Sequence, residues 1–116
     1  MRKLKKLLAV ASVAAMTLSL CACGGKKDDT YTVGICQLVQ HEALDAATKG
    51  FKDALVEEFG EDGIKFDEQN AQGDANTCAT IINGFVSSDV DLILANATPA
   101  LQAAAAGTDT IPILGT

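Results

Sequence analysis

The 116-residue sequence has one histidine, two prolines, one tyrosine and no tryptophan. Basic residues are also scarce: nine Lys plus Arg stand against fifteen Asp plus Glu, for a formal charge of −6. This balance disfavours a nucleic-acid-binding protein, because nucleic acids attract positively charged surfaces. Hydrophobic residues make up 48% of the chain, which separates it from disordered and collagen-like sequences. The length permits at most one small globular domain.

Common catalytic and cofactor motifs are missing as well. The run from His41 begins like the zinc-protease motif H-E-x-x-H, but Asp45 stands where the second histidine should be. The chain contains no G-x-G-x-x-G, no G-x-x-x-x-G-K-[ST] and no G-x-S-x-G. The sequence therefore offers no recognisable metal site, cofactor site or activated nucleophile.

The amino-terminal segment has the pattern of a secretory signal. Residues 2–6 carry four basic side chains and no acidic one, and residues 7–20 are uncharged. The uncharged stretch is shorter than the roughly 20 residues that span a bilayer, so cleavage is favoured over a retained membrane anchor.

The residues that follow, LCACGG, resemble the bacterial lipoprotein signal. Cys23 fits that signal better than Cys21, because bulky Leu20 would occupy the position before Cys21, where a small side chain is preferred. We expect residues 1–22 to be removed and Cys23 to carry two acyl chains, which anchor stably. The protein would then lie on the extracytoplasmic face of a bacterial membrane. Ordinary cleavage that leaves a free thiol is the alternative.

Residues 23–116 would form the mature protein, which is strongly acidic. They hold five lysines against fifteen acidic residues, a net charge of −10. Residues 23–30 are polar and rich in glycine, and we expect them to be a flexible tether. Cys36 and Cys78 are not in a C-x-x-C motif, so they are either two buried thiols or a disulfide.

From residue 31 onward, strand and helix patterns alternate. Short β-branched or alternating runs predict strands, and apolar residues three or four apart predict helices. The second strand carries three charges, which favours an edge position. The predicted strands are 31–38, 64–69, 90–95 and 111–114. The predicted helices are 43–59, 77–88 and 99–106.

This alternation predicts an α/β fold: a three-layer open parallel sheet with helices on both faces. The sequence stops directly after the fourth strand, so we interpret residues 31–116 as the front part of a longer protein. A complete small domain is the alternative.

Polar residues follow three of the predicted strands. In an open parallel sheet, ligands bind outside the carboxyl ends of the strands, where residues 37–42, 70–76 and 96–99 would lie. Each of these loops leads to a helix N-terminus, which suits a carboxylate or another anion. His41, Asp74 and Thr98 could cap the helices, contact a ligand, or do both. The Gln37 side chain would either bind backbone or face the ligand.

Four segments together resemble the N-terminal lobe of ABC-transporter substrate-binding lipoproteins, including the aromatic amino-acid (tryptophan-type) binding proteins. They are VGICQLVQHEALDAATKGFKDAL, DEQNAQGDANTCATI, VDLILANATPALQAAA and IPILGT. The resemblance runs from about Val33 to Thr116. It implies one lobe of a type I periplasmic-binding-protein fold, whose two lobes close over a ligand, and it implies binding and delivery to a permease, not catalysis.

The resemblance also implies which residues contact the ligand. We expect Thr98 and the helix amides after it to favour a ligand carboxylate, and Asp74 to hold an ammonium group. Glu42 departs from the family pattern, where proline is frequent, so the turn before the first helix could be looser. The implied ligand-binding residues are Gln37, His41, Asn70, Gln72, Asp74, Thr98 and Pro99.

The functional expectation is a lipid-anchored solute-binding component of an ABC importer. Its ligand would be an amino acid, with aromatic ones favoured, and its partners a permease and its ATPase. A receptor for a nucleoside or sugar is the nearest alternative, because the fold accommodates many ligands. A surface sensory module is another, and a secreted enzyme would need reactive groups from outside this sequence.

Overall fold

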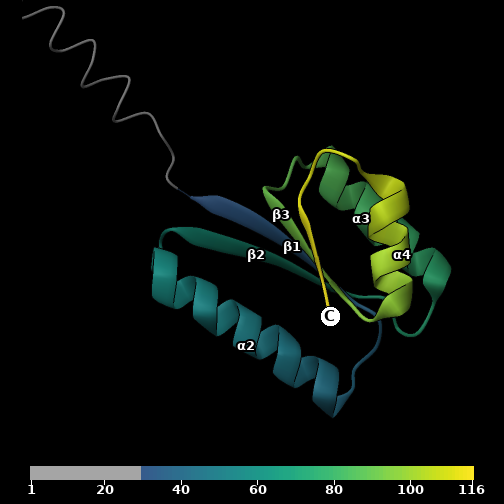
Figure 1. Cartoon of the computed structure of the whole chain (residues 1–116), viewed down its shortest axis with the longest axis horizontal. Helices are drawn as coiled ribbons and strands as arrows, with labels where there is room; N and C mark the ends of the chain where they lie inside the picture. The colour runs from purple at the N-terminus through teal and green to yellow at the C-terminus, as the bar shows by residue number, and fades with distance from the viewer. Residues whose placement is uncertain (1–29) are drawn as a thin grey trace, which may run out of the picture.

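A computed structural model of the chain describes residues 30–116 (Figure 1). The predicted signal peptide, the lipidation site Cys23 and the tether up to residue 29 lie outside the described residues. The elements are β1 (Tyr31–Gln37), α2 (Glu42–Phe59), β2 (Ile64–Asn70), α3 (Ala75–Ser87), β3 (Leu92–Asn96), α4 (Thr98–Gly107) and β4 (Ile113–Gly115).

All four predicted strands and all three predicted helices are confirmed, with shifts at the element ends. The fourth strand begins at Ile113, two residues later than predicted. Pro112 lacks the N–H that a ladder needs, and its carbonyl oxygen instead accepts a hydrogen bond from Ile93 N. The third strand likewise starts at Leu92, two residues later than predicted, because Val90 and Asp91 lie in the connection between α3 and β3.

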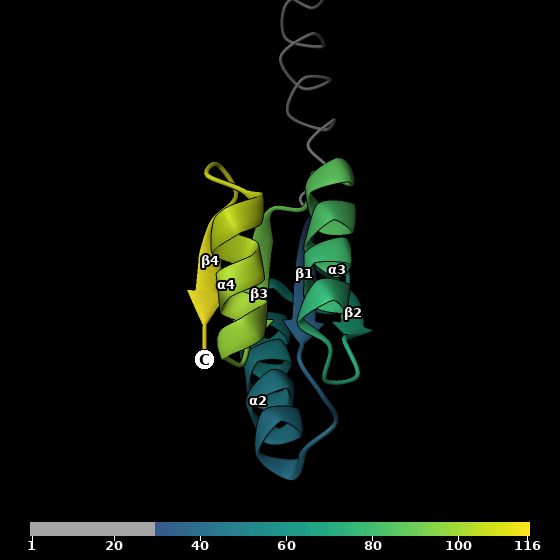
Figure 2. The ribbon, with the colours of Figure 1, turned by 90° about the vertical axis from the view of Figure 1, so that its right-hand side faces the viewer.

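The strands form one parallel sheet in the order β2-β1-β3-β4. The β1-to-β2 and β2-to-β3 connections run in opposite directions across the sheet, so right-handed crossovers place α2 and α3 on opposite faces. Figures 1 and 2 show α2 on one face and α3 with α4 on the other. The predicted three-layer α/β class is therefore confirmed, as is the edge position of β2.

Each face of the sheet carries its own apolar core. The core beneath α3 and α4 centres on Phe85 and Ile82 from α3, Ile93 from β3 and Ala104 from α4. The core beneath α2 holds Val33, Ile35, Ile64 and Leu94. Burial on both faces explains why β1 reads as an almost continuous apolar run.

Cys36 and Cys78 lie in the first of these cores as free, buried thiols. Burial, together with the neighbouring Cys78 thiol, raises the pKa of Cys36 to about 12. The Cys36 side chain therefore stays a thiol at neutral pH and packs as a small apolar group.

Within residues 30–116, no helix combines the length and apolar character that crossing a bilayer would require.

Candidate functional site

Three carboxamide side chains end three adjacent strands at one edge of the sheet. Gln37 at the end of β1 pairs with Asn70 at the end of β2 and with Asn96 at the end of β3. The chain leaves these positions towards α2, α3 and α4 respectively (Figure 2). The structure thus brings the three predicted loops together at the carboxyl edge, where parallel sheets bind ligands.

Two of the predicted site residues are helix caps. His41 Nδ1 accepts a hydrogen bond from Ala43 N at 3.2 Å and so caps α2. Asp74 caps α3: its Oδ1 accepts from Asn76 N at 2.9 Å and its Oδ2 from the Thr77 hydroxyl at 3.0 Å. Both side chains therefore satisfy amide or hydroxyl groups that a helix N-terminus leaves free.

Asn70 and Gln72 shape the turn between β2 and α3. Asn70 Oδ1 accepts from Gln72 N at 2.8 Å, an Asx-type turn. Gln72 and Gly73 both have positive φ, 53° and 83°. Both Asn70 and Gln72 are exposed at the edge of the site.

The start of α4 differs from the other two helices because no side chain among residues 30–116 caps it. Thr98 is its first residue, exposed to solvent, and Pro99 follows. Ala97, just before the helix, has φ 95° and ψ 158°, a conformation that costs energy for any residue other than glycine. The free N-terminal amides of α4 carry a partial positive charge that attracts an anion.

Gln37 is buried and its polar atoms bind the protein itself. Its Nε2 donates to Val39 O at 2.9 Å and to Asp45 Oδ1 at 2.6 Å. Its Oε1 accepts from the Thr48 hydroxyl at 2.7 Å. Of the two roles left open by the sequence, this structure has Gln37 joining the end of β1 to α2 and to the loop before it.

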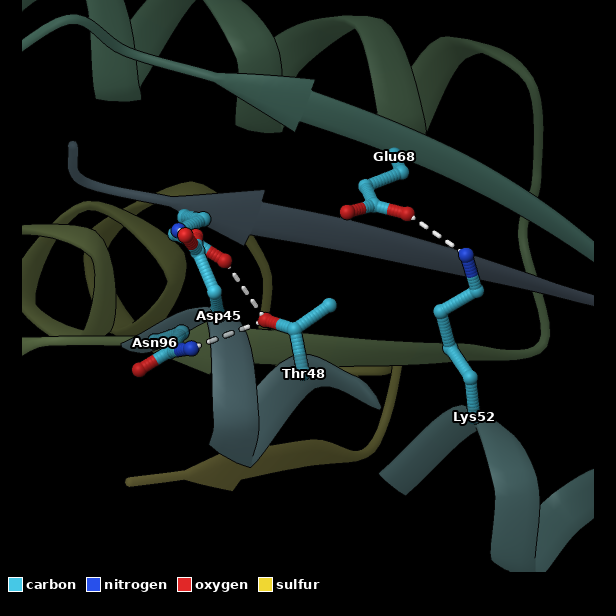
Figure 3. A network of polar contacts seen from close by, with 6 residues as sticks. Asp45, Thr48, Lys52, Glu68 and Asn96 are labelled. Atoms are coloured by element: carbon cyan, nitrogen blue, oxygen red, sulfur yellow. Dashed lines mark hydrogen bonds and ion pairs between the residues drawn. The ribbon is translucent and has the colours of Figure 1, made fainter. Parts of the chain in front are cut away.

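Asn96 extends this network to β3 (Figure 3). Its Nδ2 donates to Leu44 O and to Thr48 Oγ1, each at 2.9 Å. Asn96 is fully buried, and its Oδ1 has no hydrogen-bond partner within the described part of the chain. A buried acceptor without a donor is uncommon and marks a place where an interaction is missing.

An open cavity of about 440 Å³ lies beside this network at the ends of β1 and β2. Two acidic side chains line it, Asp45 and Glu68, and Lys52 pairs with Glu68 at 2.7 Å (Figure 3). The cavity lining is Gln37, Gln40, Asp45, Glu68, Gln69 and Asn70.

The cavity gathers only part of the predicted site. Gln37 and Asn70 line it, whereas five predicted positions lie elsewhere along the carboxyl edge and are absent from its lining. These are His41, Gln72, Asp74, Thr98 and Pro99.

Sequence reasoning missed Asp45 and Thr48 as members of the site, and it included Asn96 in a predicted loop without naming it as a site residue. Thr48 is the buried residue of α2, although it is polar and was not among the apolar residues that predicted this helix. The available signal was that Asn96, like Gln37, is a polar residue closing an apolar strand. Among residues 30–116, no three or more His, Cys, Asp or Glu side chains are placed to hold a metal ion.

The family model described as "ABC transporter substrate binding protein" matches residues 32–116, most of the sequence. The chain belongs to the ABC transporter substrate-binding protein family. A curated relative, the tyrosine-binding protein of Clostridioides difficile (strain R20291), is 50% identical over 86 residues. That match covers 72% of this chain and 25% of the relative.

Solved structures agree in sequence and in fold. A ligand-free, open substrate-binding protein with adhesive properties from Clostridium difficile is 47% identical, with a TM-score of 0.70. A Streptococcus ABC domain in complex with L-Trp is 36% identical, also at 0.70. These matches cover 73% and 74% of this chain and 30% of each solved chain, so this chain spans under a third of their length. The resemblance inferred from the sequence is confirmed.

Proposed function

We propose that this chain is the ligand-binding part of a lipid-anchored, extracytoplasmic component of an ABC importer. It captures an amino acid, with a preference for aromatic ones, and delivers it to a permease driven by its ATPase. Family membership supports a binding role instead of catalysis. Two relatives support the ligand class: one is a tyrosine-binding protein and the other was solved in complex with L-Trp.

The uncapped N-terminus of α4 is the structural observation that carries the proposal. It lies at the edge where the strands carrying Gln37, Asn70 and Asn96 end. The ligand's carboxylate binds the free amides there, with the Thr98 hydroxyl beside it. Closure of two lobes over the occupied site links ligand binding to docking on the permease.

Ligand stabilisation is the first test. L-tyrosine or L-tryptophan should stabilise the purified full chain by RT ln(1 + [L]/Kd), about 2.7 kcal/mol at one hundred times Kd. A thermal-shift series against amino acids, nucleosides and sugars measures this. Thr98→Ala should reduce the shift. Thr80→Ala should not, because Thr80 is exposed and its hydroxyl donates to Asn76 O within its own helix. Stabilisation by a nucleoside or sugar but by no amino acid would instead favour the alternative ligand classes.

Membrane anchoring is tested at the two neighbouring cysteines. Cys23→Ala should move the protein from the membrane fraction to the soluble or unprocessed pool and remove the mass of the lipid, because two acyl chains give stable attachment. Cys21→Ala, only two positions away, should leave fractionation and mass unchanged. Equal behaviour of the two variants would contradict lipidation at Cys23.

A further inference from the structure

We propose that Asp45 is the residue that binds the ammonium group of the amino-acid ligand. This inference rests on the proposed function, because it requires an amino acid as the ligand. It differs from the expectation for Asp74, which the sequence offered as the ammonium partner.

Asp45 lines the cavity, and a hydrogen bond from the buried Gln37 side chain fixes its carboxylate. It lies in the first turn of α2, is exposed, and lines the cavity of about 440 Å³. Gln37 Nε2 donates to its Oδ1 at 2.6 Å, and Gln37 is only 4% exposed. The buried Thr48 hydroxyl donates to Gln37 Oε1, and the buried Asn96 side chain donates to that hydroxyl oxygen in turn. This arrangement orients the Asp45 carboxylate before any ligand arrives.

The direction of every hydrogen bond in this network is determined. The Thr48 hydroxyl donates its one hydrogen to Gln37 Oε1, so it accepts from Asn96 Nδ2. Gln37 Nε2 uses both of its hydrogens, on Val39 O and on Asp45 Oδ1. The network therefore has no donor to spare.

Two acceptors are left over. Within residues 30–116, Asp45 Oδ2 has neither a hydrogen-bond nor an ion-pair partner, and neither does the buried Asn96 Oδ1. Figure 3 shows the Oδ1 atom of Asn96 pointing away from Thr48. Of the two, Asp45 lines the cavity and Asn96 does not, so the Asp45 carboxylate is the acceptor that a ligand can reach. An ammonium group would bring it N–H donors together with a positive charge.

The other carboxylates nearby already have partners. Glu68 pairs with Lys52, and Lys49, one turn after Asp45, pairs with Asp53. Both oxygens of Asp74 accept hydrogen bonds in the first turn of α3. Of the two acidic side chains lining the cavity, Asp45 is the one that has no cationic partner among residues 30–116.

The test compares two ligands that differ only in the ammonium group. L-tryptophan and 3-indolepropionate share the ring and the carboxylate, and NMR titration of the purified full chain measures weak binding while it reports on folding. The wild-type chain should prefer L-tryptophan at least tenfold. In Asp45→Asn this preference should fall to about one, with the affinity for 3-indolepropionate unchanged within about twofold.

Glu42→Gln is the control, and Asp74→Asn tests the competing assignment of the ammonium partner. Glu42 lies in the same first turn of α2 but outside the cavity, so its variant reproduces the change in charge near the helix end without touching the site. The Glu42→Gln control should keep the wild-type preference, and Asp74→Asn should keep it too if Asp45, not Asp74, binds the ammonium group. If Asp45→Asn keeps it, or Asp74→Asn abolishes it, Asp45 is not the ammonium-binding residue although the proposed function stands. If the folded wild-type chain binds neither compound and no amino acid stabilises it in the thermal-shift series, the proposed function fails and the role of Asp45 with it.

Discussion

Phe85→Ala is expected to lower the free energy of unfolding by about 3–5 kcal/mol. The Phe85 ring is 1% exposed and fills the centre of the core beneath α3 and α4. It lies directly over Gly34 of β1: a Cβ atom on Gly34 would approach the ring to 2.6 Å. The Phe85 ring thus fills the space that Gly34 leaves by having no side chain. Truncating Phe85 leaves a cavity that the surrounding rigid strands cannot close.

Urea unfolding followed by circular dichroism measures this change, and Phe59→Ala is the matched control. Phe59 ends α2 and is 45% exposed, with Tyr31 as its aromatic neighbour. Its removal should cost about 1 kcal/mol or less, because little buried surface is lost. A domain of this size has about 5–15 kcal/mol of stability, so only Phe85→Ala should populate the unfolded state noticeably. Similar losses for the two variants would contradict the described core.

Asn96→Asp should destabilise the protein by about 3–5 kcal/mol at neutral pH. The substitution puts a carboxylate in a fully buried position and removes the donors that bind Leu44 O and Thr48 Oγ1. Burial raises the pKa of the introduced carboxyl, since the charged form is penalised away from water. The variant's missing stability should therefore return as the pH falls.

Proton linkage gives the direction in which the stability of Asn96→Asp changes with pH. A carboxyl whose folded pKa exceeds its unfolded value contributes stability that is fully present below the unfolded pKa, about 3.9, and is lost as pH rises through the folded value. Unfolding curves at several pH values between 4 and 8 measure this trend. Asn70→Asp is the control: Asn70 is exposed and uses its Oδ1 as an acceptor, which aspartate keeps. If the difference in the free energy of unfolding between Asn96→Asp and wild type does not change with pH across this range, position 96 is not buried as described.

Much of the fold was predictable because its determinants are local or periodic. The alternation of β-branched runs with helical stripes predicted every described element, and the charges around Asp67 and Glu68 predicted that β2 is an edge strand. The element ends were less predictable. Pro112 shows why: whether a residue joins a strand depends on which neighbour needs its N–H or its carbonyl oxygen.

The candidate site was predictable in location but not in detail. Parallel strands bring the three loops to one edge, so placing Gln37, Asn70 and Thr98 there needed only the order of elements. Whether Gln37 turns inward could not be read from the sequence, because its partner Thr48 lies eleven residues away on a helix whose rotation depends on packing. Asn96 bonds to a threonine 48 residues away.

The sequence by itself determined the fold class, the family and the edge of the sheet that forms the site, because hydrophobic period, chain order and motif are properties of neighbouring residues. Only the tertiary structure decided which polar side chains remain available to a ligand. Asp74 and His41 bind helix amides and Gln37 binds α2, whereas one oxygen of Asp45 has no partner among residues 30–116 and lies beside the cavity. The physical reason is that hydrogen bonds saturate: a donor used inside the protein is lost to the ligand, and its use depends on contacts between distant segments.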